Sequence, residues 1–130
     1  MAIKPHAYRV GAPDPWEYLI ASEIADCKVG MALVENAGKL EKASGATKPT
    51  YISMYGKAAE DGQQIPVIRV NPQTVYGTQF AAAASAVKVG DKVTIDTTGT
   101  MATANTTDGV LEIVELHGNA EGDTVLVRIP

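Results

Sequence analysis

Residues 28–38 read KVGMALVENAG, and the triplet that opens this stretch recurs at 88–90, a spacing of 60 residues (88 − 28 = 60). After each triplet come residues of high β propensity, a glycine and a short polar stretch. A period of this length exceeds the periods of the common solenoid repeats. The recurrence therefore predicts two related β-units within one domain.

The two copies also end in the same way, with an acidic turn that contains glycine and then an apolar run. These closing segments are 60–62 and 65–70 in the first copy, and 121–123 and 125–129 in the second. We therefore expect pseudo-repeated halves over about 28–70 and 88–130, joined by a linker over 71–87. Together they form a single β-domain, 28–130.

Short runs of β-branched and aromatic residues, bounded by Gly, Asn, Asp or Pro, predict strands throughout this domain. The expected strands are 31–35, 51–55, 65–70, 92–96, 110–116 and 124–129, with shorter returning strands at 39–43 and 100–104. No long helical pattern interrupts them. The sequence thus predicts an all-β fold, a compact β-barrel built from the two halves.

Residues 1–27 lie outside the repeated pattern and are expected to form an extended N-terminal arm. The arm holds Pro5, Pro13 and Pro15, three of the seven prolines, together with the single Trp. Proline fixes its own φ and favours extended backbone in the residue before it. One alternative within the arm is a short helix over 16–26, because Pro15 suits a first helical position.

The bulk composition limits the classes of partner. A chain of 130 residues fits one domain, and a net charge of −4 without any basic stripe argues against nucleic acid. The longest apolar-rich run, 80–89, is shorter than the roughly 20 residues of a membrane span, and the N-terminus lacks the apolar region of a signal peptide. We expect a soluble protein that binds neither nucleic acid nor membrane.

Residues suited to catalysis are sparse. His6 and His117 stand in no metal-binding spacing, and Cys27 is the only cysteine, expected to be a small buried or half-buried thiol. Arg69 and Arg128, near the ends of apolar strands, read as edge-strand charges that discourage aggregation. No phosphate-binding glycine motif is present. We expect no catalytic residue, cofactor or metal, and thus a binding or structural module rather than an enzyme.

The run 28–43, followed by Tyr51-Ile52-Ser53, resembles the small decoration (cement) proteins of tailed-bacteriophage heads. In that family a "G-x-A-L … G-x-L … A" segment leads into a strand and a glycine-bounded turn. The second half, through Gly90, Gly99 and Gly109, continues the theme. The resemblance covers about 100 residues and does not reach the arm.

The resemblance implies a β-tulip-like fold and a virion structural protein. Such a protein would be made in the host cytoplasm and bind the outer surface of the capsid, where it would stabilise contacts between major capsid proteins. It also implies a homo-oligomer, with a trimer as one option. The alternative is a generic β-barrel binding module that recognises peptide or carbohydrate.

The arm is the segment that we expect to contact a capsid partner. An extended segment can add a strand to a neighbouring sheet while aromatic side chains anchor it. The expected partner-binding residues are Ile3, Lys4, His6, Tyr8, Val10, Pro13, Trp16 and Tyr18. A second possibility is that the arm folds back onto its own domain.

Overall fold

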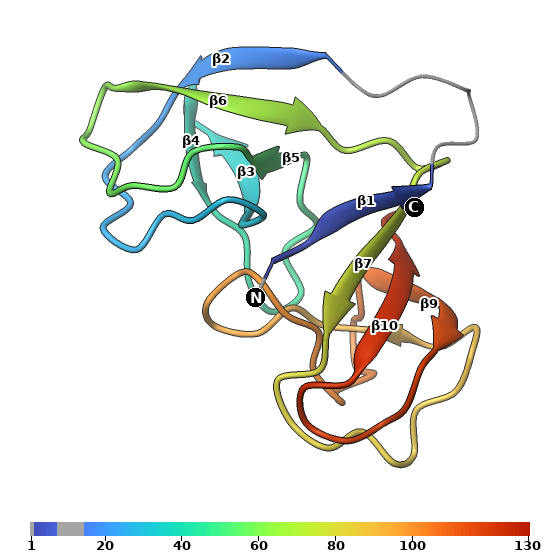
Figure 1. Cartoon of the computed structure of the whole chain (residues 1–130). Helices are drawn as coiled ribbons and strands as arrows, with labels where there is room; N and C mark the ends of the chain where they lie inside the picture. The colour runs from blue at the N-terminus through green and yellow to red at the C-terminus, as the bar shows by residue number, and fades with distance from the viewer. Residues whose placement is uncertain (1, 8–14) are drawn as a thin grey trace.

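The chain forms ten β-strands in two antiparallel sheets, and no helix occurs in residues 2–7 and 15–130, the part that this computed structural model describes (Figure 1). The strands are β1 (Lys4–Ala7), β2 (Trp16–Ile20), β3 (Ala32–Asn36), β4 (Lys39–Lys42), β5 (Tyr51–Ser53), β6 (Gln64–Arg69), β7 (Val75–Gln79), β8 (Lys92–Val93), β9 (Leu111–Leu116) and β10 (Thr124–Arg128). The predicted all-β character is confirmed. Without a helix, these residues also offer none that could span a membrane.

Each sheet has five strands. Sheet 1 has the order β2-β6-β5-β3-β4, and sheet 2 has the order β1-β7-β10-β9-β8. The first half of the chain therefore builds sheet 1, and the second half builds sheet 2 with β1 added at its edge. In Figure 1, β2 and β6 lie across the top of the molecule, and β7 and β10 lie below β1.

The expected barrel is wrong, because neither sheet closes on itself. In the described chain, β1 and β8 share no ladder, and β2 and β4 meet only near the isolated bridge between Ala21 and Leu40. The alternative of a helix over 16–26 is also wrong. Residues 16–20 pair with β6 instead, and the aromatic and β-branched residues among them have high strand propensity.

The ladders of the two sheets can be compared pair by pair. In sheet 1, Ala32 pairs with Ile52 and Ile52 with Ile68; in sheet 2, Lys92 pairs with Glu112 and Glu112 with Arg128. Each residue of the second set lies 60 positions after its counterpart (92 − 32, 112 − 52, 128 − 68). Along the strand orders, β7 therefore holds the place in sheet 2 that β2 holds in sheet 1.

The same spacing of 60 residues relates the turns that contain the triplets 28–30 and 88–90. The Gly30 N–H donates to the Ser53 carbonyl at 2.7 Å, and the Gly90 N–H donates to the Ile113 carbonyl at 2.9 Å. Both glycines have positive φ, 86° and 95°. Glycine adopts this conformation without the steric cost that a Cβ brings.

Two clusters of buried side chains make up the core. One lies within sheet 1 and includes Met31, Leu33, Leu40, Ile65 and Val67. The other fills sheet 2 and extends to Ala32, Ile52 and Ile68 of sheet 1, and also to Ile3. The second cluster therefore joins the two sheets.

The N-terminal strand lies where the two sheets meet. Ile3 is 0% exposed, and its N–H donates to the Gly30 carbonyl at 2.9 Å. The following residues pair with β7, with Lys4 opposite Gly77. A Cβ added at Gly30 would overlap Ala2, whereas one added at Gly90 would have no neighbour within 4 Å.

We predict that Gly30→Ala destabilises the protein more than the matched Gly90→Ala variant. Both substitutions place a Cβ in the left-handed region, which costs roughly 1–2 kcal/mol. Only the first also forces the N-terminal strand away, and overpacking adds about 1–3 kcal/mol. Urea unfolding monitored by circular dichroism measures both values. Equal losses would contradict the tight packing of residue 2 on the Gly30 turn.

We also predict that Ile3→Ala lowers the free energy of unfolding by roughly 2–5 kcal/mol, because it empties a fully buried site. The control is Lys4→Ala at the exposed neighbouring position, with an expected change within about 0.5 kcal/mol. The same unfolding experiment compares them. A loss for Ile3→Ala as small as that of the control would mean that the segment does not pack on the core in solution.

Candidate docking surface

The structure divides the predicted partner-binding residues between the two sheets. Lys4 and His6 are exposed on β1, and Trp16 and Tyr18 are exposed on β2. Ile3 is buried in the core shared by the sheets, so its side chain is not accessible in this conformation. Tyr8, Val10 and Pro13 lie outside the described residues.

Strand β2 carries the most prominent apolar surface of the described chain. Trp16, Tyr18 and Ile20 are 58%, 61% and 43% exposed, and only Val29 and Val89 are comparable large apolar side chains. Because alternate residues of a strand share a face, the three form one row, the β2 strip. Their cross-strand neighbours on β6 are Ile68, Pro66 and Gln64, which carry no charge.

Ile20 was missed by the sequence reasoning. Exposure over Trp16–Ile20 has a period of two in the structure, but Leu19 is apolar, so the sequence itself does not alternate between apolar and polar residues. The helical alternative placed Trp16 and Ile20 on one face, since residues four apart are neighbours on a helix, and Tyr18 on another.

The other face of β2 is held by its own sheet. Leu19 packs against the core of sheet 1, and Glu17 accepts hydrogen bonds from the Arg69 guanidinium, at 3.0 Å from Nη2 and 3.3 Å from Nε. The hydrogen bond to Glu17 raises the pKa of Arg69, and the guanidinium lies 5.2 Å from the centre of the Tyr51 ring. These contacts fix β2 on β6 and leave the β2 strip free.

The expectation that Arg69 and Arg128 are edge-strand charges is wrong. Arg69 belongs to β6 and Arg128 to β10, and each of these strands has a neighbour on both sides. Arg128 pairs with Glu112 of β9 at 2.9 Å. Both arginines therefore form ion pairs across a ladder.

Two shallow hollows adjoin the sheets. One, of about 470 Å³, is lined by Ala2, Lys4, Pro5, His6, Gly77, Thr78, Gln79 and Thr124. The other, of about 230 Å³, is lined by Lys48, Pro49, Thr50, Arg69, Val70, Pro72 and Ile129. The first lining contains His6 and the hydroxyls of Thr78 and Thr124, and the Thr78 hydroxyl donates to the Thr100 carbonyl at 2.8 Å.

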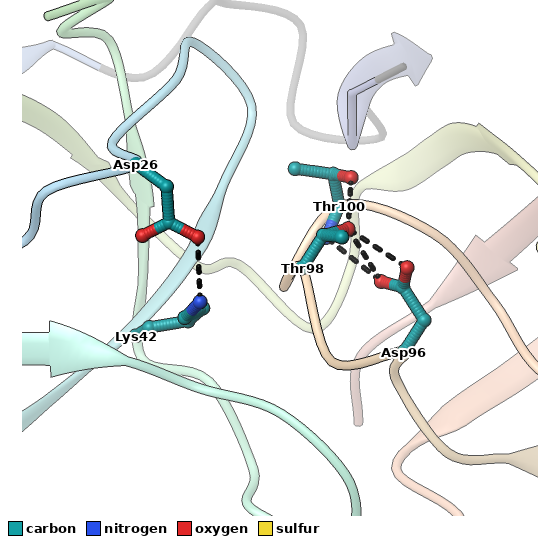
Figure 2. A network of polar contacts seen from close by, with 5 residues as sticks. All are labelled: Asp26, Lys42, Asp96, Thr98 and Thr100. Atoms are coloured by element: carbon teal, nitrogen blue, oxygen red, sulfur yellow. Dashed lines mark hydrogen bonds and ion pairs between the residues drawn. The ribbon is translucent and has the colours of Figure 1, made fainter.

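A polar network stabilises the loop of sheet 2 that touches sheet 1 (Figure 2). Asp96 Oδ1 accepts the N–H groups of Thr100 and Met101 at 3.2 and 3.0 Å, and the Thr98 hydroxyl donates to both carboxylate oxygens. The Thr98 and Thr100 hydroxyl oxygens lie 2.7 Å apart. All of these hydrogen bonds lie within the loop itself. The described residues contain no cluster of His, Cys, Asp and Glu that could hold a metal.

Lys42 of sheet 1 lies beside this loop (Figure 2). Its Nζ is 2.7 Å from Asp26 Oδ2, and this hydrogen bond is the main cause that lowers the pKa of Asp26. A Cβ on Gly99 would come within 3.0 Å of Lys42 Cγ. The stem of Lys42 therefore packs on the loop while its amine binds Asp26.

Cys27 is confirmed as a buried thiol. It is 4% exposed, and its Sγ lies 3.4 Å from the Ser53 hydroxyl. Burial raises the pKa of the Cys27 thiol, which disfavours the reactive thiolate. The exposed His117 is paired with Glu115 at 3.2 Å. Nothing in this arrangement activates the sulfur.

We predict that Cys27 of the folded protein reacts with 5,5′-dithiobis(2-nitrobenzoate) at pH 8 at least about tenfold more slowly than in denaturing urea. The matched control is the double variant Cys27→Ser/Ala25→Cys, whose thiol occupies an exposed turn position and should react fast in the folded state. Absorbance at 412 nm follows both reactions. Equally fast modification of the native thiol would show that the Cys27 turn opens readily.

Comparisons with protein-family models, with curated protein sequences and with solved structures gave no significant match to the chain.

Proposed function

We propose that the protein is a structural binding protein that fastens to the outer surface of a tailed-phage capsid and stabilises contacts between major capsid proteins. The observation that carries the binding role is the β2 strip, a row of exposed large apolar side chains on a strand held by β6. Trp and Tyr are enriched among the residues that dominate binding energy at protein interfaces. The capsid as partner rests on the resemblance of residues 28–53 to the decoration proteins.

Rigidity supports this role. Glu17 and Leu19 hold β2 from its other face, so the strip is arranged before a partner arrives. Preorganised side chains lose less conformational entropy on binding. If one subunit grips two or three neighbouring capsid proteins, the later contacts become intramolecular and avidity rises by roughly 10² to 10⁴. Binding to the assembled shell alone would stabilise that state by mass action.

We further infer that the two sheets are a pseudo-repeat, with a unit of about 60 residues. The support is the constant spacing of the paired residues and of the Gly30 and Gly90 hydrogen bonds. In this interpretation β2 and β7 are the corresponding outer strands of the two units, and only β1 is an addition, at the edge of the second unit. Residues 8–14, between β1 and β2, complete the proposed capsid-binding arm.

The alternative function is a module that binds peptide. It is favoured by the 470 Å³ hollow beside β1, where Lys4, His6 and Gln79 offer hydrogen-bonding groups. The hollow lacks the aromatic faces that carbohydrate sites usually present. A peptide in this hollow would contact β1 and not the β2 strip.

We predict saturable co-sedimentation of the protein with expanded, undecorated phage shells. The double variant Trp16→Ala/Tyr18→Ala should bind at least about tenfold more weakly, because each anchor at an interface is worth around 2 kcal/mol. The control is Val89→Ala, which trims an equally exposed apolar side chain on a turn of sheet 2. Absence of binding to several candidate shells, with a folded protein, would contradict the capsid proposal. If the double variant Lys4→Ala/His6→Ala lost binding instead, the result would favour the alternative function, peptide binding at the hollow beside β1.

A further inference from the structure

Gly77 lies in the middle of β7, and neither the backbone nor the packing of the fold requires a glycine there. Its φ is outside the left-handed region, where glycine is favoured. A Cβ at this position would meet only Leu126 Cδ2, at the ordinary contact distance of 3.6 Å. Glycine weakens a strand interior, and it often marks a place where a ligand or another backbone comes close.

Sheet 1 carries a large side chain at the corresponding position. Gly77 pairs with Leu126 as Tyr18 pairs with Pro66, and Leu126 lies 60 positions after Pro66 (126 − 66 = 60). The aromatic ring of Tyr18 is accommodated there with 61% exposure. The face that forms a protruding row on β2 is therefore recessed on β7, and the difference lies in the side chains and not in the strand pairing.

Polar side chains surround the recess that Gly77 leaves open. Lys4 is the partner of Gly77 on β1, and Gln79 pairs with Thr124 of β10. Alternate residues of a strand share a face, and so do directly paired residues of neighbouring strands. These four residues therefore lie on one face of sheet 2, and all of them line the hollow of about 470 Å³.

His6 lines the same hollow from β1. The register of β1 with β7 shifts between Pro5 and Ala7, so His6 is the extra residue of a bulge, and bulges often aim a side chain toward a site. Both His6 and Lys4 are exposed. Within the described part of the chain, neither side chain has a hydrogen-bond or ion-pair partner.

The hollow is a basic site on a chain whose net charge is −4. Its lining, drawn from the described residues, includes Lys4 and no acidic side chain. Two carboxylates in the adjoining segments are bound elsewhere. Glu115 of β9 pairs with His117, and Asp123 accepts the Ala120 N–H at 3.0 Å. The Lys4 ammonium is therefore available to an anion from outside.

We propose that this hollow binds a carboxylate of a peptide segment, with Lys4 as the cation that pairs with it. Hydrogen bonds between charged groups are roughly twice as strong as neutral ones. His6, Gln79 and Thr124 offer further hydrogen-bonding groups, and the recess over Gly77 admits the atoms next to the carboxylate. One permanent positive charge matches a carboxylate, whereas a phosphate group carries about −1.5 to −2 at pH 7.

The peptide would lie over the face of sheet 2 and not along the edge of β1. The Ile3 N–H is turned away from β7, toward the Gly30 carbonyl. By alternation, Pro5 is the next residue turned to that edge, and it has no N–H to give an added strand. The site is separate from the β2 strip, so the inference goes beyond the capsid proposal, and it gives the peptide-binding alternative a defined chemistry.

The test is an NMR titration of the full isotope-labelled chain with short synthetic peptides. The peptide acetyl-Ala-Gly-Asp-Gly-Ala-amide carries one side-chain carboxylate, and acetyl-Ala-Gly-Gly with a free C-terminus carries one terminal carboxylate. We expect saturable amide shifts at Lys4, His6, Gly77 and Thr124 with at least one of them, and the tighter peptide identifies the source of the carboxylate. The matched peptide with Asn in place of Asp should bind at least about fivefold more weakly than the Asp peptide.

Two variants test the two parts of the site. Lys4→Gln should weaken binding at least about fivefold, whereas the control Lys92→Gln, which removes the same charge from β8 outside the hollow, should leave binding unchanged. Gly77→Val should fill the recess and abolish binding. Urea unfolding should show that this variant is at least as stable as the native chain, because valine suits a strand better than glycine.

Several outcomes would overturn the proposal. They are no saturable shifts with either carboxylate peptide, equal binding of the Asn peptide, tighter binding of inorganic phosphate, or unchanged binding by Lys4→Gln or Gly77→Val. A marked loss of stability in Gly77→Val would also count against it, since the fold would then need the glycine. Shell co-sedimentation is a separate measurement, so the capsid proposal stands or fails on its own result.

Discussion

The packing of the N-terminal segment against the Gly30 turn is the contact on which the arrangement of the two sheets depends. Ile3 fills the core that both sheets share, and its N–H binds the Gly30 carbonyl. Gly30 has no room for a side chain because Ala2 lies against it. A segment distant in sequence from β7 therefore becomes an edge strand of the second sheet, and the chain cannot separate into two independent halves without exposing this core.

The other contacts between the sheets reinforce this junction. The Ala32 N–H donates to the Gly99 carbonyl at 2.8 Å, and Gly45 and Ile95 exchange backbone hydrogen bonds. Asp96 holds the intervening loop in shape, and the stem of Lys42 packs on it. Buried polar groups that are satisfied in this way add specificity to an apolar contact, because any other arrangement would leave them without partners.

A rigid junction has consequences for binding. The β2 strip belongs to a strand that pairs with β6 and whose opposite face is held by Leu19 and Glu17. The orientation of the strip therefore follows that of the whole molecule. An exposed row of large apolar side chains is costly for a protein that remains alone, because it invites association. The capsid proposal supplies a partner that would cover the β2 strip.

The sequence by itself determined the class of the fold and most strand positions, because alternation and turn residues are local signals. The strand after 36–38 is an example: Ala37 and Gly38 adopt the positive φ of a tight hairpin, and β4 follows at Lys39. The exposure of Trp16 and Tyr18 could not be predicted in this way. It depends on which strands become edges, and that is decided by pairing between residues far apart in the chain. Only the tertiary structure could therefore bury Ile3, place Arg69 and Arg128 on inner strands, leave the sheets open, and turn an expected loose arm into two strands of different sheets.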